Sequence, residues 1–197
     1  TNDTYVRLDR ELARLFSALD QYVGKGNYTL FLTADHGLGE VPKYLTDHKI
    51  PAGDLKIANI TASASAFLNK ELGAGTWVET CRNEQFYLNR ELINEKKLKL
   101  VDVQNLLANF IRDQEGVFQV FTATQLNEYE FTQSVANKVQ NGFYYQRCGD
   151  VKFILNPGWY ADLTTSATHS APFNYDTQVP LLFYGAGVRK GESFNYH

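Results

Sequence analysis

The chain opens with an amphipathic pattern that predicts a helix over residues 3–23. Apolar residues recur there at spacings of three and four, which places them on one face of a helix: Tyr5, Leu8, Leu12, Leu15, Phe16, Leu19 and Tyr22. Gly24 and Gly26 follow directly, and glycine readily adopts the left-handed conformation that ends a helix. The apolar run "YTLFLTA" (28–34) then predicts a short strand covered on both faces. A helix, a tight turn and a strand form half of an α/β unit.

The pattern changes between residues 59 and 125, where short strands alternate with two helices. Helical periodicity marks "ASAFLNKELG" and "VDVQNLLANFIRDQEG", while "TWVETCR", "QFYLN" and "VFQVFTA" have the composition of strands. We expect residues 59–125 to form a small α+β subdomain inserted into an α/β core of residues 1–58 and 126–197. Within that core, the sequence predicts a loop over residues 37–58 and a further helix over residues 131–145.

Two late segments return to the pattern of buried strands. They are "DVKFILNPGW" (150–159) and "QVPLLFYGAG" (178–187), and each is stopped by proline or glycine. The chain therefore begins and ends with the elements of an α/β fold.

The composition excludes several classes of protein. A hydrophobic fraction of 44% and a charged fraction of 21% are typical of globular domains, and 12 Tyr and 13 Phe argue against disorder. The net charge of −3, from 19 basic and 22 acidic residues, lacks the basic excess of a nucleic-acid-binding surface. No apolar run approaches the roughly 20 residues of a membrane span.

The chain contains no methionine, and we therefore expect it to be a piece of a longer protein. Its compartment cannot be inferred from its own ends. Cys81 and Cys148 either pair in an oxidising compartment or remain thiols, and their spacing leaves both possibilities open.

The first candidate site is Asp35-His36-Gly37, directly after the first predicted strand. Ligands gather at the carboxyl ends of strands in open α/β sheets, and carboxylate and imidazole are good ligands for zinc. An Asp-His pair also fits ordinary capping or turn chemistry, so its residues alone leave the choice open.

His169 is the second candidate, because it lies in the polar, small-residue loop "TSATHSAPFNYD" rather than on an apolar face. Asp176 precedes the last predicted strand, and we expect its carboxylate to accept backbone N–H groups and order this loop.

Other polar residues have plainer interpretations. His48 in "LTDHKIP" follows no apolar strand, and we interpret it, like the terminal His197, as structural or incidental. The segment "GAGVRKG" lacks the third glycine of a dinucleotide-binding turn. Three serines lie in no nucleophile-elbow pattern: Ser63, Ser65 and Ser170. The sequence therefore nominates no nucleophile.

In combination, "LFLTADHG" and "HSAPFNYDTQVPLLFYGAGVRKG" resemble the alkaline phosphatase superfamily. The similarity is greatest to the type I phosphodiesterase/nucleotide pyrophosphatase branch, and within it to bacterial alkaline phosphatases of the PafA type. "YVRLDRELARLFSALD" and "GDVKFILNPGW" are similar to further segments of that group, so the resemblance spans nearly the whole chain. It implies an α/β fold with a mostly parallel sheet flanked by helices, alkaline-phosphatase-like but incomplete, with a small α+β insertion.

The resemblance also implies a site with two zinc ions that acts on a small phosphate ester. Asp35 and His36 match the pair that ligates one ion, and His169 matches a ligand of the other. The Thr or Ser nucleophile and the remaining ligands of that family precede this region, and residues 1–34 contain no counterpart. We therefore expect the carboxy-terminal portion of a zinc-dependent phosphomonoesterase, periplasmic or secreted. The 197 residues alone are expected to be inactive and to bind zinc weakly.

Other functions remain open at this stage. A phosphodiesterase or nucleotide pyrophosphatase shares the metal ligands and differs around the nucleophile. A sulfatase or phosphoglycerate mutase relative shares the Asp-His-Gly strand end. A non-catalytic binding module would need none of the upstream groups, and the tyrosines and phenylalanines of residues 118–145 suit such a surface, although core packing explains them more simply.

Overall fold

The computed structural model describes residues 2–163 and 165–194. The chain divides into two compact units, which are described separately below. The first contains the chain up to Asp35 and from Val179 onward, and the second runs from His36 to Gln178. The division into a core and an inserted subdomain that the sequence suggested stays a prediction.

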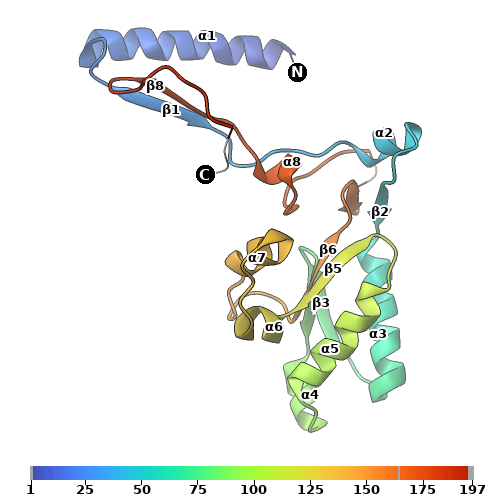
Figure 1. Cartoon of the computed structure of the whole chain (residues 1–197). Helices are drawn as coiled ribbons and strands as arrows, with labels where there is room; N and C mark the ends of the chain where they lie inside the picture. Colours follow the sequence, from blue (N-terminus) through green and yellow to red (C-terminus); the bar gives the residue numbers. More distant parts are fainter. Residues whose placement is uncertain (1, 164, 195–197) are drawn as a thin grey trace. The chain divides into compact units, whose positions relative to one another are not determined.

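In the first unit, one helix lies along a ribbon of two antiparallel strands (Figure 1). The elements are α1 (Asn2–Leu19), the π-helical turn η1 (Asp20–Gly24), β1 (Thr29–Thr33) and β8 (Leu181–Gly185). The predicted amino-terminal helix is confirmed. Gly24 ends it with a φ of 97°, which only glycine adopts without strain.

The expectation that the strand in residues 28–34 is covered on both faces is wrong for the described residues. Phe31 and Phe183 lie opposite each other on the ribbon and are 64% and 57% exposed. On the other face, Phe16 of α1 stacks on Tyr184 with 5.1 Å between ring centroids. A single helix covers only one face of the ribbon, so strands of buried-type composition remain half uncovered here.

The second unit is built on a four-stranded antiparallel sheet with the order β3-β4-β6-β5. Its strands match those predicted from the sequence: β3 (Val78–Arg82), β4 (Gln85–Leu88), β5 (Val117–Thr122) and β6 (Val151–Leu155). A separate pair, β2 (Gly53–Leu55) with β7 (Trp159–Ala161), is parallel. Four of the five strand pairs in the described residues are antiparallel, so the mostly parallel sheet implied by the resemblance is not assembled within them.

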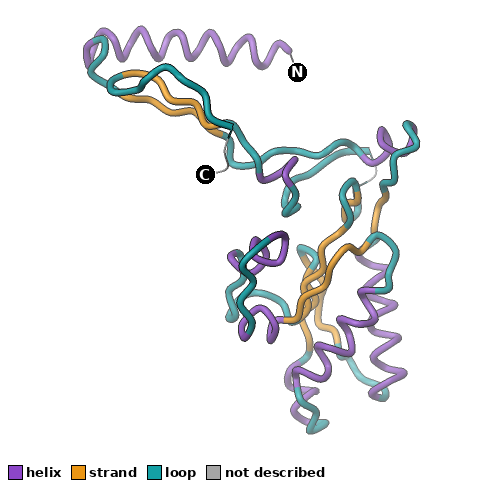
Figure 2. Tube along the Cα trace, in the orientation of Figure 1, coloured by secondary structure: helices purple, strands orange, loops and turns teal. Residues whose placement is uncertain are grey.

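Helices pack on both faces of this sheet, as the helix and strand colours of Figure 2 make visible. On one face are α3 (Ile57–Leu72) and α5 (Leu100–Arg112), which bury Trp77, Phe86 and Phe153. Side chains of β5 and β6 alternate between the faces, so Phe121 and Ile154 point the other way, toward α6 (Ala123–Glu128) and α7 (Ser134–Asn141). The helices predicted over the corresponding segments are confirmed, except that α6 was not predicted.

The loop predicted over residues 37–58 is wrong, because it contains α2 (Pro42–Asp47) and β2. Proline at the first helical position has a preset φ and lacks only an N–H that would have no partner there, so Pro42 begins a helix rather than preventing one. Two other short helices had no clear periodicity: α4 (Arg90–Glu95) and α8 (Asn174–Thr177). None of the described helices combines the length and apolar character that crossing a membrane requires.

A buried carboxylate joins three elements of the second unit. Asp150, 2% exposed, accepts hydrogen bonds from the Leu88 N–H at 2.9 Å, the Arg90 guanidinium at 2.9 Å and the Gln104 amide at 3.2 Å. These donors come from β4, α4 and α5. The network ties the sheet to its helical cover and satisfies polar groups that water cannot reach.

Both cysteines are free thiols, and the structure makes their expected reactivities different. Burial raises the pKa of the Cys81 thiol to about 11, against a partial opposing effect of a hydrogen bond with Thr61. From an ordinary value of 9.0, this shift lowers the thiolate fraction at pH 8 by about 100-fold. We expect iodoacetamide to label Cys148, which is only partly buried, well before Cys81, as measured by peptide mapping of the native chain.

Denatured chain in urea provides the control, because both thiols are then equally accessible and are expected to react at similar rates. Equal labelling rates in the native chain would contradict the burial of Cys81.

Candidate functional site

The segment after β1 lies against the segment that contains α8. The Gly37 N–H donates to the Asp176 carbonyl at 2.7 Å, and the Leu38 N–H donates to the Tyr175 carbonyl at 3.1 Å. A Cβ at Gly37 would lie 2.1 Å from the Tyr175 carbonyl oxygen, which no side chain tolerates. The glycine of the Asp-His-Gly sequence is therefore needed for this close approach.

The paired segments bring together the two histidines that the sequence singled out. The rings of His36 and His169 stack with 3.7 Å between centroids and 14° between planes. These residues are far apart in the chain, and nothing in their local sequence patterns predicts the contact. Asp35, the third candidate, directly precedes His36 in the chain and is the last residue of the first compact unit before the chain enters the second.

Backbone and hydroxyl groups orient the two imidazoles. The Nδ1 of His36 lies 2.7 Å from the Gly37 carbonyl oxygen, which can only accept, so Nδ1 carries the proton and the lone pair is on Nε2. The Nδ1 of His169 is 3.3 Å from the Ser170 hydroxyl. A histidine that binds a metal through Nε2 typically has Nδ1 held in this way.

The loop that carries His169 is ordered by Asp176, as the sequence predicted. The Asp176 carboxylate is 3% exposed and accepts the Ala171 N–H at 2.6 Å through Oδ2. Ser170, between His169 and this hydrogen bond, has a φ of 94°, a conformation that L-residues rarely adopt.

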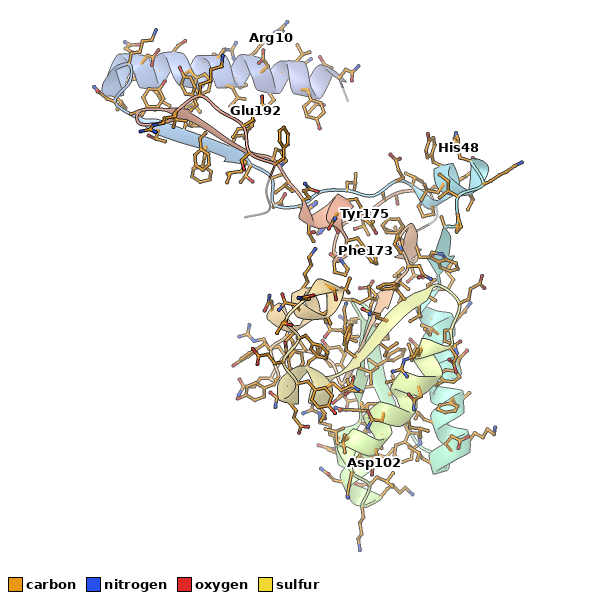
Figure 3. All side chains as sticks on the ribbon, viewed as in Figure 1. Arg10, His48, Asp102, Phe173, Tyr175 and Glu192 are labelled. Carbon is orange, nitrogen blue, oxygen red and sulfur yellow. The ribbon has the colours of Figure 1, made fainter. Side chains whose placement is uncertain are left out.

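Two tyrosines lie close to this loop. Tyr160 and Tyr175 line a small hollow together with His169 (Figure 3 labels Tyr175 at α8). Burial raises the pKa of Tyr175 to about 12, with a further contribution from Tyr160 and an opposing backbone contact at Gly158. Burial also raises the pKa of Tyr160, and the nearby Asp176 carboxylate adds to that effect. Both phenols are therefore protonated at neutral pH and unsuited to act as nucleophiles.

Lys152 also lines the hollow, but its ammonium group already has partners. It donates to the Asn83 carbonyl at 2.7 Å and to the Glu84 carboxylate at 3.3 Å. Burial lowers the pKa of Lys152, and the Glu84 charge opposes this. Sequence reasoning missed Lys152, Tyr160 and Tyr175, since each lies in an ordinary strand or turn pattern and no local signal marks it.

The remaining sequence candidates lie outside this grouping. His48, which ends α2 (labelled in Figure 3), bonds the Tyr44 carbonyl through Nδ1 at 2.7 Å and packs on the Tyr44 ring, in agreement with a structural role. Ser65 donates to the Thr61 carbonyl within α3. His197 lies outside the described residues.

The two imidazoles are of a type that binds zinc, but they are fewer than the ligands that a zinc site needs. Imidazole nitrogens are suitable ligands, and their Nδ1 contacts have the form seen around metal-bound histidine. However, over residues 2–163 and 165–194 no three His, Cys, Asp or Glu side chains are grouped so that they could hold a metal ion. These residues do not by themselves make a complete metal site.

The model of the family described as "Type I phosphodiesterase / nucleotide pyrophosphatase" matches residues 1–177. The chain belongs to this family. That membership confirms the resemblance seen in the Asp-His-Gly strand end and the late His169 segment.

Two curated relatives of this chain are alkaline phosphatases. PafA of Elizabethkingia meningoseptica is 34% identical over 97% of this chain and 35% of its own length. PhoV of Synechococcus elongatus is 36% identical over 97% of this chain and 34% of its own length. The chain thus spans about a third of the length of these two relatives.

The solved structure of wild-type alkaline phosphatase PafA superposes with a TM-score of 0.86 at 34% identity. The match covers 98% of this chain and 37% of the PafA chain. The match confirms an α/β fold of the alkaline phosphatase type, and this chain corresponds to part of that fold.

Proposed function

We propose that this chain is the carboxy-terminal part of a zinc-dependent phosphomonoesterase that hydrolyses small phosphate esters. The observation that carries the proposal is the stacking of His36 on His169, because two distant segments bring two oriented imidazoles to one place. The similarity to two alkaline phosphatases supports the same reaction class. The resemblance to these enzymes also supports a periplasmic or secreted location.

In the proposed site, Asp35 and His36 hold one zinc ion and His169 helps to hold a second. When bound, a pair of such ions lowers the pKa of an attacking hydroxyl and stabilises charge on the leaving oxygen. The attacking Thr or Ser and the remaining ligands are proposed to come from sequence that precedes these residues in the parent protein. Three ligands divided between two ions are too few for tight binding, so the 197 residues alone are proposed to be inactive.

The chain's own contribution is to place and orient its imidazoles. The Gly37 carbonyl holds the proton of His36 on Nδ1, and Ser170 contacts the corresponding atom of His169. Tyr160 and Tyr175 stay protonated and add apolar surface beside the loop. None of these groups donates or removes a proton in the proposal.

A second candidate, a phosphodiesterase or nucleotide pyrophosphatase, is favoured by the description of the matching family. The two activities are separated by assaying the full-length parent with an aryl phosphate monoester and with the matching diester, before and after treatment with a chelator. We expect the monoester to have the higher kcat/KM and its turnover to disappear with chelator and return with zinc.

A preference for the diester would replace the proposed activity with the second candidate. Turnover that survives metal removal would contradict the zinc site. Turnover of neither ester would favour the non-catalytic binding module. The 197-residue chain, assayed beside its parent, is expected to show no hydrolysis.

A further inference from the structure

The segment from His169 to Asp176 is held by the rest of the second unit in its carboxy-terminal half and at Thr177, the next residue. Lys138 of α7 donates to the Pro172 carbonyl at 3.0 Å and to the Thr177 hydroxyl at 2.9 Å. Phe173 packs edge-on against Phe118, with 5.5 Å between the ring centroids. These contacts fix the carboxy-terminal half of the segment. The direction of the His169 ring therefore depends on the contacts of the amino-terminal half, residues 169–171.

Asp176 contacts this amino-terminal half of the segment. Its side chain accepts the Ala171 N–H at 2.6 Å, two residues after His169. Its main-chain carbonyl accepts the Gly37 N–H at 2.7 Å, one residue after His36. One residue therefore contacts both segments that carry the stacked histidines, through two different groups.

The local backbone needs such a restraint. Ser170, with φ of 94°, connects His169 to Ala171 in a conformation that costs a non-glycine residue about 1–3 kcal/mol. Strain of this kind persists only where surrounding contacts hold it. The hydrogen bond from Ala171 to Asp176 restrains the backbone of the residue directly after the strained one.

Stability alone does not explain a buried polar side chain at this position. Asp176 is 3% exposed, and within the described part of the chain its Oδ1 has no hydrogen-bond partner. Burying a carboxylate with an unsatisfied oxygen is unfavourable for folding. A buried polar atom without a partner is rare in folded proteins and calls for an explanation, and a functional role is one of the recognised ones.

We propose that Asp176 is a positioning residue, whose side-chain oxygen, by accepting the Ala171 N–H, sets the orientation of His169 relative to His36. The consequence for catalysis rests on the proposed function, in which both histidines bind metal. The geometric claim is independent of it, because it concerns only the placement of two rings. Asp176 itself contacts neither substrate nor metal in this proposal.

Two substitutions separate the hydrogen bond from the charge and shape of the side chain. Asp176→Asn keeps an oxygen that can accept the Ala171 N–H but removes the charge. Asp176→Leu has a similar shape and no acceptor. The matched controls are Asp47→Asn and Asp47→Leu, because Asp47 is exposed on α2 and its carboxylate pairs with Lys43 of the same helix.

The variants are made in the full-length parent, and two quantities are measured. The first is the separation of the His36 and His169 rings in crystal structures of wild type and variants. The second is kcat/KM for the aryl phosphate monoester. For Asp176→Leu we expect His169 to move by about 1 Å and kcat/KM to fall by about 100-fold, since a misplacement of that size has this effect on catalysis.

For Asp176→Asn we expect the ring separation of wild type and a kcat/KM within about three-fold of it, because the acceptor is retained. Both Asp47 variants are expected to match wild type. A Leu variant with unmoved rings would overturn the proposal, and so would an Asn variant as impaired as Leu. If the parent hydrolyses no phosphate ester, the proposed function fails while the ring positions still test Asp176.

Should Asp176→Leu fail to fold, Asp176→Ser provides the second variant, since its shorter side chain cannot span to Ala171 but remains polar. Its expected result is the same displacement of His169, and rings in the wild-type position would overturn the proposal.

Discussion

Replacement of His36 by alanine in the full-length parent is expected to lower kcat/KM for an aryl phosphate monoester by at least about 1000-fold. The proposed role of His36 is to hold one of two metal ions, and a catalytic metal contributes several kcal/mol of transition-state stabilisation. Each 1.36 kcal/mol corresponds to a factor of ten in rate, so three such factors are a conservative expectation. Zinc content per chain, measured by atomic absorption, is expected to fall in the same variant.

His48→Ala is the matched control, because it removes the same side chain from the same compact unit. The His48 side chain bonds the Tyr44 carbonyl and packs on that residue's ring, so its loss is expected to change kcat/KM by less than about two-fold. A His36→Ala enzyme with full activity and full zinc content would contradict the proposed metal site. An enzyme that loses activity but keeps zinc would assign His36 a role other than ligation.

Replacement of Asp150 by alanine is expected to have the largest effect on stability, lowering the free energy of unfolding by about 3 kcal/mol. The substitution leaves the Leu88 N–H and the Gln104 amide buried without their acceptor. Each unsatisfied buried group costs about 1–3 kcal/mol. Arg90 is half exposed and regains water, so the loss of its ion pair adds little.

The measurement is urea unfolding of the chain, followed by tryptophan fluorescence. Both tryptophans, Trp77 and Trp159, lie in the second unit, so the signal reports that unit. With an m value of about 1–3 kcal/mol/M, a loss of this size lowers the unfolding midpoint by at least about 1 M urea.

Asp113→Ala provides the comparison, because Asp113 is exposed at the end of α5, where a negative charge is unfavourable to the helix. Its midpoint is expected to stay close to that of wild type. An Asp150→Ala midpoint equal to that of Asp113→Ala would contradict the structural importance of the buried network.

Local patterns predicted the elements with long or regular periods. The amino-terminal helix, α5 and the four strands of the second unit follow from apolar spacing and from β-forming composition. The same reasoning failed for α2 and α8, because helices of six and four residues are too short to show a period. It also failed for the covering of β1, since composition reports suitability for burial but not what is present to bury it.

The candidate residues were identified from the sequence, but their arrangement was not. Asp-His-Gly at a strand end and a histidine in a polar loop marked His36 and His169 as unusual, and Asp176 was expected to order the loop. Each of these inferences depends on neighbours within a few positions. The ring stacking depends instead on backbone hydrogen bonds between segments remote in the chain, which require Gly37 at the contact.

The sequence by itself therefore determined the main helices and strands, the family and the residues with unusual chemistry. Only the tertiary structure decided the antiparallel pairing of the four-stranded sheet, the buried network around Asp150 and the juxtaposition of His36 with His169. The physical reason is that hydrophobic periodicity is a property of neighbouring residues, whereas hydrogen bonds between distant segments depend on which surfaces meet when the whole chain packs.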